Sequence, residues 1–271
     1  MNLGVIQKAL REGWAITALC GVGIMAFEAL VAWVFYNYQE QLSSEILEIE
    51  FVRDFVESLI GSELGDVLDP SALRSLAWVH PLVLAILWTH AITFCSRVPA
   101  GEIDRATADI LFSLPVSRWQ VYRSESLVWL LLGAIVIFMA LCGNYLGHLT
   151  VPIEERPELE RSIVVAINFY CLYFTVGAMA LLLSACSDRR GRAVGISVTI
   201  LLVQFVWNFL GQYWQTAADL SWLTILNYYG PMAILVEGTV PARDMGALLA
   251  VGIVLWTAGG LTLARRDICT V

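Results

Sequence analysis

The chain has 271 residues, of which 58% are hydrophobic and only 15% are charged, and its formal net charge is −8. This composition is too apolar for an ordinary soluble domain, and the acidic balance gives no support to nucleic-acid binding. We therefore expect a protein that folds in a lipid bilayer and binds no nucleic acid.

Six apolar runs are long enough to cross a bilayer, which takes roughly 20 apolar residues. These runs cover residues 13–36, 76–96, 127–149, 163–186, 193–214 and 245–264. We expect an all-α polytopic membrane protein in which residues 1–271 form a single transmembrane domain with six spans. Short cytoplasmic segments collect Lys and Arg, and with the amino terminus inside, most of the arginines fall on the inner side. Both termini are therefore expected to be cytoplasmic.

Residues 2–12 place Leu3, Ile6 and Leu10 on one helical face, while Lys8 and Arg11 lie elsewhere. This pattern predicts an interfacial helix that lies along the inner membrane surface before the chain turns into the first span. Such a helix can do docking or mechanical work, or it can be a simple anchor.

Glu28 is an acid well inside the first span. An ionisable group at that depth is costly and usually faces protein or water. It either lines a transport pathway or is a buried, protonated group with a structural hydrogen bond, and the sequence leaves both open.

The loop at 37–74 is long and acidic, and its apolar residues recur at helical spacing. We expect an amphipathic helix on the outer side, resting on the membrane or on the outer mouth of a partner subunit. An acidic outer face can attract cations or simply keep the surface solvated.

The stretch "GEIDRATADILFSLPVSRWQVYR" lies between the second and third spans, within residues 97–123. Ile103, Ala106, Ile110 and Leu114 recur at steps of three and four, which predicts a short amphipathic cytoplasmic helix. Pro115 ends that helix, and Ser117 with Gln120 forms a capping-box pattern that opens the next one. A force on this element would move the spans on either side.

Further along, Gly143 and Gly147 form a small-xxx-small step on the third span, which can mark a packing face. The segment 217–243 has an apolar run that is too short to span and is broken at Gly230 and Pro231. It is expected to form short interfacial helices or a re-entrant turn at the outer surface.

An intramembrane enzyme is disfavoured. His80 and His90 are separated by about 15 Å of helix, which is too far for one metal ion. No HExxH, GxSxG or paired-acid motif accompanies them. We assign no catalytic residue and no metal site, and the cysteines form no CxxC pair.

The stretch "GEIDRATADILFSLPVSR" resembles the cytoplasmic loop of type-2 permeases of ATP-binding cassette (ABC) exporters, where an acidic "GE" precedes a small-Thr step and a "LLSLPVSR"-like run. "LLLSACSDRRGRAVGISV" and the "LARRDI" near the carboxyl terminus are also similar to that family. These permeases often have Gly before the Thr, and Ala106 departs from this pattern.

The resemblance implies a membrane half-transporter whose loop at 97–123 is a coupling helix seated in a groove of a separate ATPase subunit. In that interpretation Leu111, Phe112 and Leu114 dock in the groove, and Thr107 and Pro115 belong to the matching motif. Charge pairs with the ATPase would be made by Glu102, Asp104, Arg105, Asp109 and Arg118. A second contact, or merely a signal for topology, would be formed by Arg189, Arg190 and Arg192.

Energy must come from the partner, because the chain has no GxxxxGK[ST] motif and Lys8 is its one lysine. ATP and Mg would be bound by the ATPase, with no cofactor on this chain. Six spans are few to enclose a pathway, so we expect a second copy or a related permease, in a bacterial plasma membrane. Export is favoured over import by the resemblance. The alternatives are an ion-coupled secondary transporter that uses Glu28, and a non-transporting membrane anchor or regulator.

Overall fold

The computed structural model describes residues 2–38, 70–113, 115–152, 156–211 and 213–267. Within these residues the fold is helical and contains no strand, which confirms the predicted fold class. Most of the acidic loop at 37–74 lies outside the described residues, and so does its predicted amphipathic helix.

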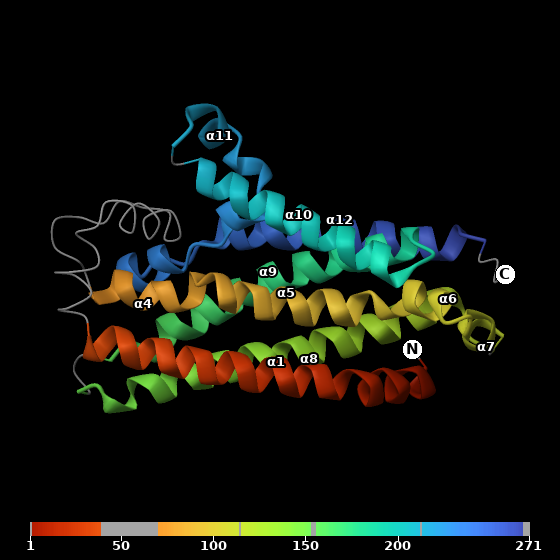
Figure 1. The fold of residues 1–271 in the computed structure, drawn as a ribbon, viewed down its shortest axis with the longest axis horizontal. Coiled ribbons are helices and arrows are strands. Elements are labelled where there is room, and N and C mark those ends of the chain that lie inside the picture. The colour runs from red at the N-terminus through yellow and green to blue at the C-terminus, as the bar shows by residue number, and fades with distance from the viewer. Residues whose placement is uncertain (1, 39–69, 114, 153–155, 212, 268–271) are drawn as a thin grey trace.

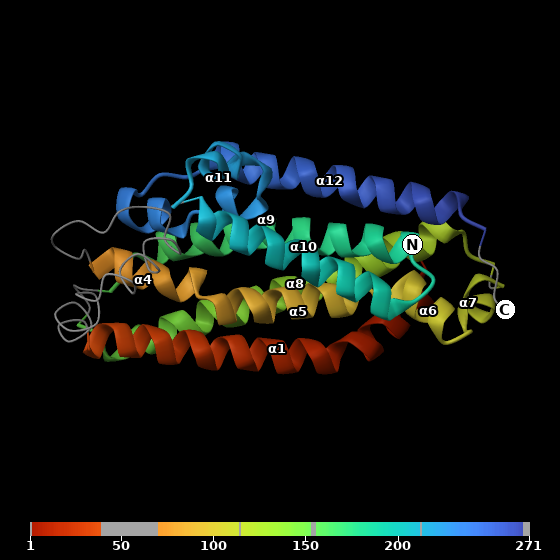
Figure 2. The same ribbon diagram turned by 45° about the horizontal axis from the view of Figure 1, so that its top comes forward.

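Among the described residues, five helices are long and apolar enough to cross a membrane, and they run lengthwise along one elongated bundle (Figures 1 and 2). They are α1 (Leu3–Asn37), α8 (Arg118–Gly147), α9 (Leu159–Cys186), α10 (Arg190–Leu210) and α12 (Ala242–Arg265). Each of them contains or largely overlaps one of the apolar runs found in the sequence, because length and composition are the strongest signals of a span.

The second predicted span, 76–96, is a broken helix. Its residues are divided between α4 (Pro70–Val79) and α5 (Pro81–Cys95). Pro81 cannot donate a backbone hydrogen bond to the preceding turn, so a new helix begins there, and His80 caps it by accepting from the Leu82 backbone N–H at 3.2 Å. α5 is bent by 61° from the segment Arg97–Asp104, and the two together make up the sixth candidate span.

Residues 2–12 do not form a separate interfacial helix, because α1 continues without a break from Leu3 to Asn37. No proline or other helix breaker separates the two segments, and the side chain of Asn2 caps the helix at its start. Val5, Ala9 and Gly13 face the bundle at steps of four, whereas the predicted apolar face, with Leu3 and Leu10, is exposed.

Glycines bring α1 and α8 into close contact. A Cβ atom added to Gly143 would lie 2.7 Å from the Met25 Cα atom, and one added to Gly147 would lie 2.7 Å from the Ala32 Cβ atom. The small-xxx-small step on the third span therefore is a packing face, and the helix it packs against is α1 of the same chain.

A polar chain crosses the core between four helices. His90 on α5 lies 3.0 Å from the Thr17 hydroxyl of α1 through Nε2 and 2.9 Å from the Tyr173 hydroxyl of α9 through Nδ1. The Tyr173 hydroxyl also lies 3.2 Å from the Trp129 carbonyl of α8. His90 is thus a satisfied core histidine, and it fixes how these helices pack.

The two ends of the bundle differ. The first turn of α1, the last turn of α12 and the short helices α6 (Glu102–Asp104) and α7 (Ala108–Phe112) gather at one end, which we call the α7 end (Figure 1). The segment 217–243 lies at the opposite end (Figure 1). It folds as short turns at Gln215–Asp219 (α11), Ser221–Leu223, Ile225–Tyr228 and Ala233–Glu237.

Candidate functional site

The loop between α5 and α8 is a chain of short turns rather than one amphipathic helix. After a π-helical turn at Arg97–Gly101, α6 ends at Asp104, and α7 begins only at Ala108. Thr107 interrupts the helix because its backbone N–H donates to the Glu102 carbonyl at 2.9 Å and its hydroxyl donates to Glu102 Oε2 at 2.6 Å. These bonds replace the ones that a continuous helix would make.

The start of α8 follows the sequence prediction. The Ser117 hydroxyl accepts from the Gln120 backbone N–H at 3.2 Å, and Gln120 Oε1 accepts from the Ser117 backbone N–H at 2.9 Å. This capping box is confirmed, and Pro115 lies in the break before it. The loop therefore feeds directly into a membrane-spanning helix.

Ala106 reverses the loop between α6 and α7, with a φ of 55° in the left-handed region. A side chain with a Cβ atom is strained there, and glycine is not. This is the position at which the resembling permeases often carry glycine, so the departure noted in the sequence falls at the strained residue.

Substitution of Ala106 by glycine is expected to raise the free energy of unfolding by about 1 kcal/mol, because it removes the left-handed strain. Thermal unfolding of the purified chain in detergent measures this. Ala85 on α5, which is exposed and helical, is the control: its replacement by glycine is expected to destabilise by about 1 kcal/mol. A loss of stability in both variants would show that the backbone at Ala106 is not strained.

A cluster of alternating charges ties the loop to the spans. Lys8 Nζ lies 2.6 Å from Glu102 Oε1 and 3.2 Å from Glu12 Oε1. Arg97 Nη2 lies 2.7 Å from Glu125 Oε2, and Arg97 Nη1 lies 3.5 Å from Glu12 Oε2. The charge cluster of Lys8, Glu12, Arg97, Glu102 and Glu125 thus joins α1, the loop and α8.

Glu102 therefore does not fit its predicted role in a charge pair with a partner. Its carboxylate is buried and bonded to Lys8 and Thr107 within the chain. Arg97 and Glu125 also belong to the site, although they were not predicted from the sequence. The available signal was their place at the edges of two apolar runs, where a charge is buried only if it is paired.

Leu111, which was predicted to dock in the ATPase, faces the bundle, and its neighbour Ile110 faces outward. Leu111 is only 6% exposed and packs in a small cluster with Val5, Val98 and Val121, whereas Ile110 is 69% exposed. The two residues are neighbours in sequence and both are apolar. The contact of α7 with α1 and α8 decides which of them faces inward. Leu111 is thus corrected to a residue that seats α7 on the bundle.

The other predicted docking residues are divided. Phe112 is half-buried, with the Arg118 guanidinium 5.7 Å from its ring centroid, and Leu114 lies outside the described residues. Asp104, Arg105 and Asp109 are exposed. Together with Ile110 they form the exposed surface of the loop, which we call the loop face.

Arg118 also makes contacts within the chain. Its Nη1 donates to the Leu263 carbonyl at 3.3 Å and to the Arg266 carbonyl, at the end of α12. Arg266 in turn donates from Nη1 to the Ala185 carbonyl of α9 at 2.7 Å and pairs with Asp188. Cations at carboxyl-terminal helix ends are favoured by the helix dipole, so both arginines hold the α7 end together.

The predicted second contact is likewise only partly on the surface. Arg190 donates to the Thr93 carbonyl at 2.9 Å and to the Ser96 hydroxyl at 3.2 Å, which joins α10 to α5. Arg189 and Arg192 are exposed at the same end.

Glu28 is fully buried between α1 and α8. Asn144 Nδ2 donates to its Oε2 at 2.9 Å, and Oε1 has no hydrogen-bond partner among the described residues. Within the same residues, no group of His, Cys, Asp or Glu has the geometry of a metal site.

Comparison with known proteins connects this geometry to a family. The curated citrate-proton symporter of Klebsiella pneumoniae is 26% identical over 230 residues, which cover 78% of this chain and 50% of the symporter. The chain thus spans about half the length of this relative. No solved structure matches the chain at a significant level. A family model described as ABC-2 family transporter protein matches residues 8–265. Because this match covers nearly the whole chain and five of its helices can span a membrane, the protein is a multi-pass membrane protein that belongs to the ABC-2 transporter family.

Proposed function

We propose that this chain is the permease subunit of an ATP-driven exporter and that residues 97–123 couple it to a separate ATPase subunit. ATP and Mg would be bound by that ATPase, and this chain would carry no catalytic residue. The supporting observation is the loop face, an exposed surface of Asp104, Arg105, Asp109 and Ile110. The loop that carries it is tied to two spans by the buried Arg97–Glu125 ion pair and by the half-buried Lys8–Glu102 pair.

The connections of the loop support a mechanical role. A partner that moves Ile110 also moves Leu111, which rests on Val5 of α1 and Val121 of α8. Lys8–Glu102 and Arg97–Glu125 join the loop to the same two helices, and such pairs are poorly screened when they are buried. Motion of the loop would therefore be passed to α1 and α8 together.

The α7 end would face the cytoplasm, with both termini inside, in a bacterial plasma membrane. The arginines at this end support that orientation under the positive-inside rule. A second copy of the chain or a related permease would complete the pathway, and export follows from family analogy.

The test is co-purification of the tagged chain from its native host with a matched pair of variants. Ile110→Glu places a charge on the loop face, and Val240→Glu makes the same change at a residue that is 60% exposed between Glu237 and α12. We expect an ATPase with a phosphate-binding loop to accompany the original chain and Val240→Glu, and to be lost from Ile110→Glu.

Two results would contradict the proposal. The first is equal recovery of the ATPase with Ile110→Glu and Val240→Glu, which would move the contact away from the loop face. The second is the absence of any ATPase from the original chain after crosslinking in intact membranes, which would reject ATP-driven transport.

An ion-coupled secondary transporter is the second candidate, favoured by the unpartnered Oε1 of buried Glu28 and by the similarity to a citrate-proton symporter. Proteoliposomes that contain only this chain would then take up substrate when a proton gradient is imposed. We expect no such uptake. Gradient-driven citrate uptake that is lost in Glu28→Gln would support the secondary transporter instead.

A further inference from the structure

Three of the described glutamates are buried, and they differ in what surrounds their carboxyl groups. Glu102 and Glu125 each form an ion pair, at 2.6 Å and 2.7 Å, so their negative charges are compensated within the chain. Glu28 is fully buried, and its one hydrogen-bond partner among the described residues is the neutral amide of Asn144, 2.9 Å from Oε2. Glu28 thus differs from the other two in having no cation as its partner.

The surroundings of Glu28 favour a neutral carboxylic acid. A buried charge without a counter-charge is far more costly than a buried hydroxyl without a hydrogen bond. Because Asn144 donates to Oε2, we assign the proton to Oε1, the oxygen that has no partner among the described residues. Glu28 can therefore lose and regain a proton without breaking an ion pair.

The other titratable groups near Glu28 make hydrogen bonds that their neutral forms satisfy. They are Tyr229, His80 and His148, on the segments around Glu28. The Tyr229 hydroxyl donates to a backbone carbonyl at 3.1 Å, and His80 accepts from a backbone N–H at 3.2 Å. His148 Nδ1 lies 2.7 Å from the Asn144 carbonyl. Glu28 is thus the group of this region whose change of charge has to be explained.

Asn144 contacts Glu28 and also lines a small polar cavity. This cavity of about 20 Å³ lies between the end of α8 and the start of α9, opposite the α7 end. His148 and Ser162 line it as well, and Leu159 at its edge is 55% exposed. A water molecule needs about 10–15 Å³ and two to four polar partners, so the cavity can hold one.

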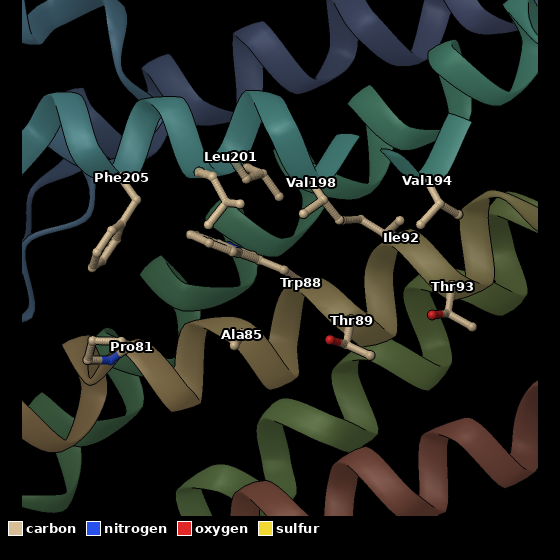
Figure 3. Close-up of a pocket in the computed structure, with 11 residues that line it drawn as sticks. Pro81, Ala85, Trp88, Thr89, Ile92, Thr93, Val194, Val198, Leu201 and Phe205 are labelled. Carbon is tan, nitrogen blue, oxygen red and sulfur yellow. The ribbon is translucent and has the colours of Figure 1, made fainter. Parts of the chain in front are cut away.

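The larger groove, between α5 and α10, differs from this cavity. Its volume is about 410 Å³, and its walls are almost entirely apolar (Figure 3). It offers a water molecule few hydrogen-bond partners. The small cavity beside Asn144 is therefore the one that can bring water close to Glu28.

We propose that Glu28 is a proton-binding site that exchanges with the solution at the end of the bundle opposite the α7 end. An amide does not carry protons, so the Asn144 side chain must turn aside for water from the cavity to contact the carboxyl group. Glu28 Oε1 then gives its proton to the water, which leaves a carboxylate and a hydronium ion, and the reverse step restores the acid. The site does not depend on the proposed ATPase, and exchange at one end requires no transport of protons.

Infrared spectroscopy of the purified full chain in detergent tests the protonation of Glu28, because a carboxylic acid and a carboxylate have separate stretching bands. We expect a carboxylic acid band that is missing from Glu28→Gln and present in Glu12→Gln, since Glu12 is paired with Lys8. This band should weaken as the pH rises, by roughly tenfold per pH unit once most of the groups have ionised.

The route of exchange is tested by transfer into heavy water, since the same band shifts when deuterium replaces the proton. Ser162→Leu fills the cavity, and Ser162→Ala is the matched control that leaves it open. We expect exchange at Glu28 to be several-fold slower in Ser162→Leu than in Ser162→Ala. Asn144→Ala removes the side chain between the cavity and Glu28 and should make exchange faster than in the original chain.

Three results would overturn the proposal. The first is an unchanged carboxylic acid band in Glu28→Gln, and the second is a Glu28 band that does not respond to pH. The third is equal exchange in Ser162→Leu and Ser162→Ala, which would place the route elsewhere. Thermal unfolding shows whether each variant is folded, and if Ser162→Leu is not, the absence of faster exchange in Asn144→Ala rejects the route instead.

Discussion

Replacement of Arg97 by alanine is expected to lower the free energy of unfolding by about 3–5 kcal/mol, because it leaves Glu125 as an uncompensated buried charge. The side chains of Arg97 and Glu125 are only 8% and 5% exposed, and their charged atoms lie 2.7 Å apart. Arg97 also donates to the Ala9 carbonyl at 3.3 Å, so the variant loses a link to α1 as well. Unfolding by a denaturing detergent in mixed micelles measures the loss.

Two variants separate the buried charge from a general sensitivity of the loop. Arg105→Ala removes an exposed arginine of the same loop and is expected to change stability by less than about 0.5 kcal/mol. Arg97→Met combined with Glu125→Leu replaces both charges with apolar groups and should recover most of the loss. If Arg97→Ala destabilises the chain no more than Arg105→Ala does, the buried ion pair contributes little to stability.

The fold class and five of the six spans could be predicted from the sequence, because they depend on the length and apolarity of the runs, whereas the break in the second span at Pro81 was not predicted. The capping box at Ser117 and Gln120 was also predictable, since both of its bonds join residues three apart. The continuity of α1 was missed because the exposed, apolar face with Leu3 and Leu10 resembles that of an interfacial helix. In the bundle, that face lies outward and the small residues Ala9 and Gly13 face inward.

The candidate site was predictable only as a segment. Lys8 and Glu102 are 94 residues apart in sequence, and no local pattern indicates that they meet. Periodicity likewise placed Ile110 on the apolar face, whereas the structure buries its neighbour Leu111. The choice depends on Val121 of α8, which packs against Leu111 in the folded chain.

The arginines show a second limit of prediction from the sequence. The positive-inside rule counts them by side of the membrane and treats them alike. In the structure Arg118, Arg190 and Arg266 donate to backbone carbonyls of neighbouring helices, whereas Arg189 and Arg192 stay exposed. A cationic motif near the end of a membrane-spanning helix can thus be part of the fold, and the count of charges does not separate its buried members from its exposed ones.

Because α1 and α8 are in tight contact, replacing glycine with alanine is expected to change the free energy of unfolding in opposite directions at two positions. Gly143→Ala is expected to destabilise the chain by about 2–3 kcal/mol, because the added Cβ atom would lie 2.7 Å from the Met25 Cα atom and the two helices must separate. Gly23→Ala adds the same atom to α1 where nothing lies within 4 Å, and the higher helix propensity of alanine should stabilise by up to about 1 kcal/mol.

Both glycine variants can be compared by the same unfolding titration in mixed micelles. Equal effects of the two substitutions would mean that α1 and α8 do not approach as closely as the structure has them. Opposite effects would identify Gly143 as the position that permits the approach. Because α1 and α8 are the two helices that the charge cluster ties to the loop, the proposed coupling to an ATPase should also be weaker in Gly143→Ala than in Gly23→Ala.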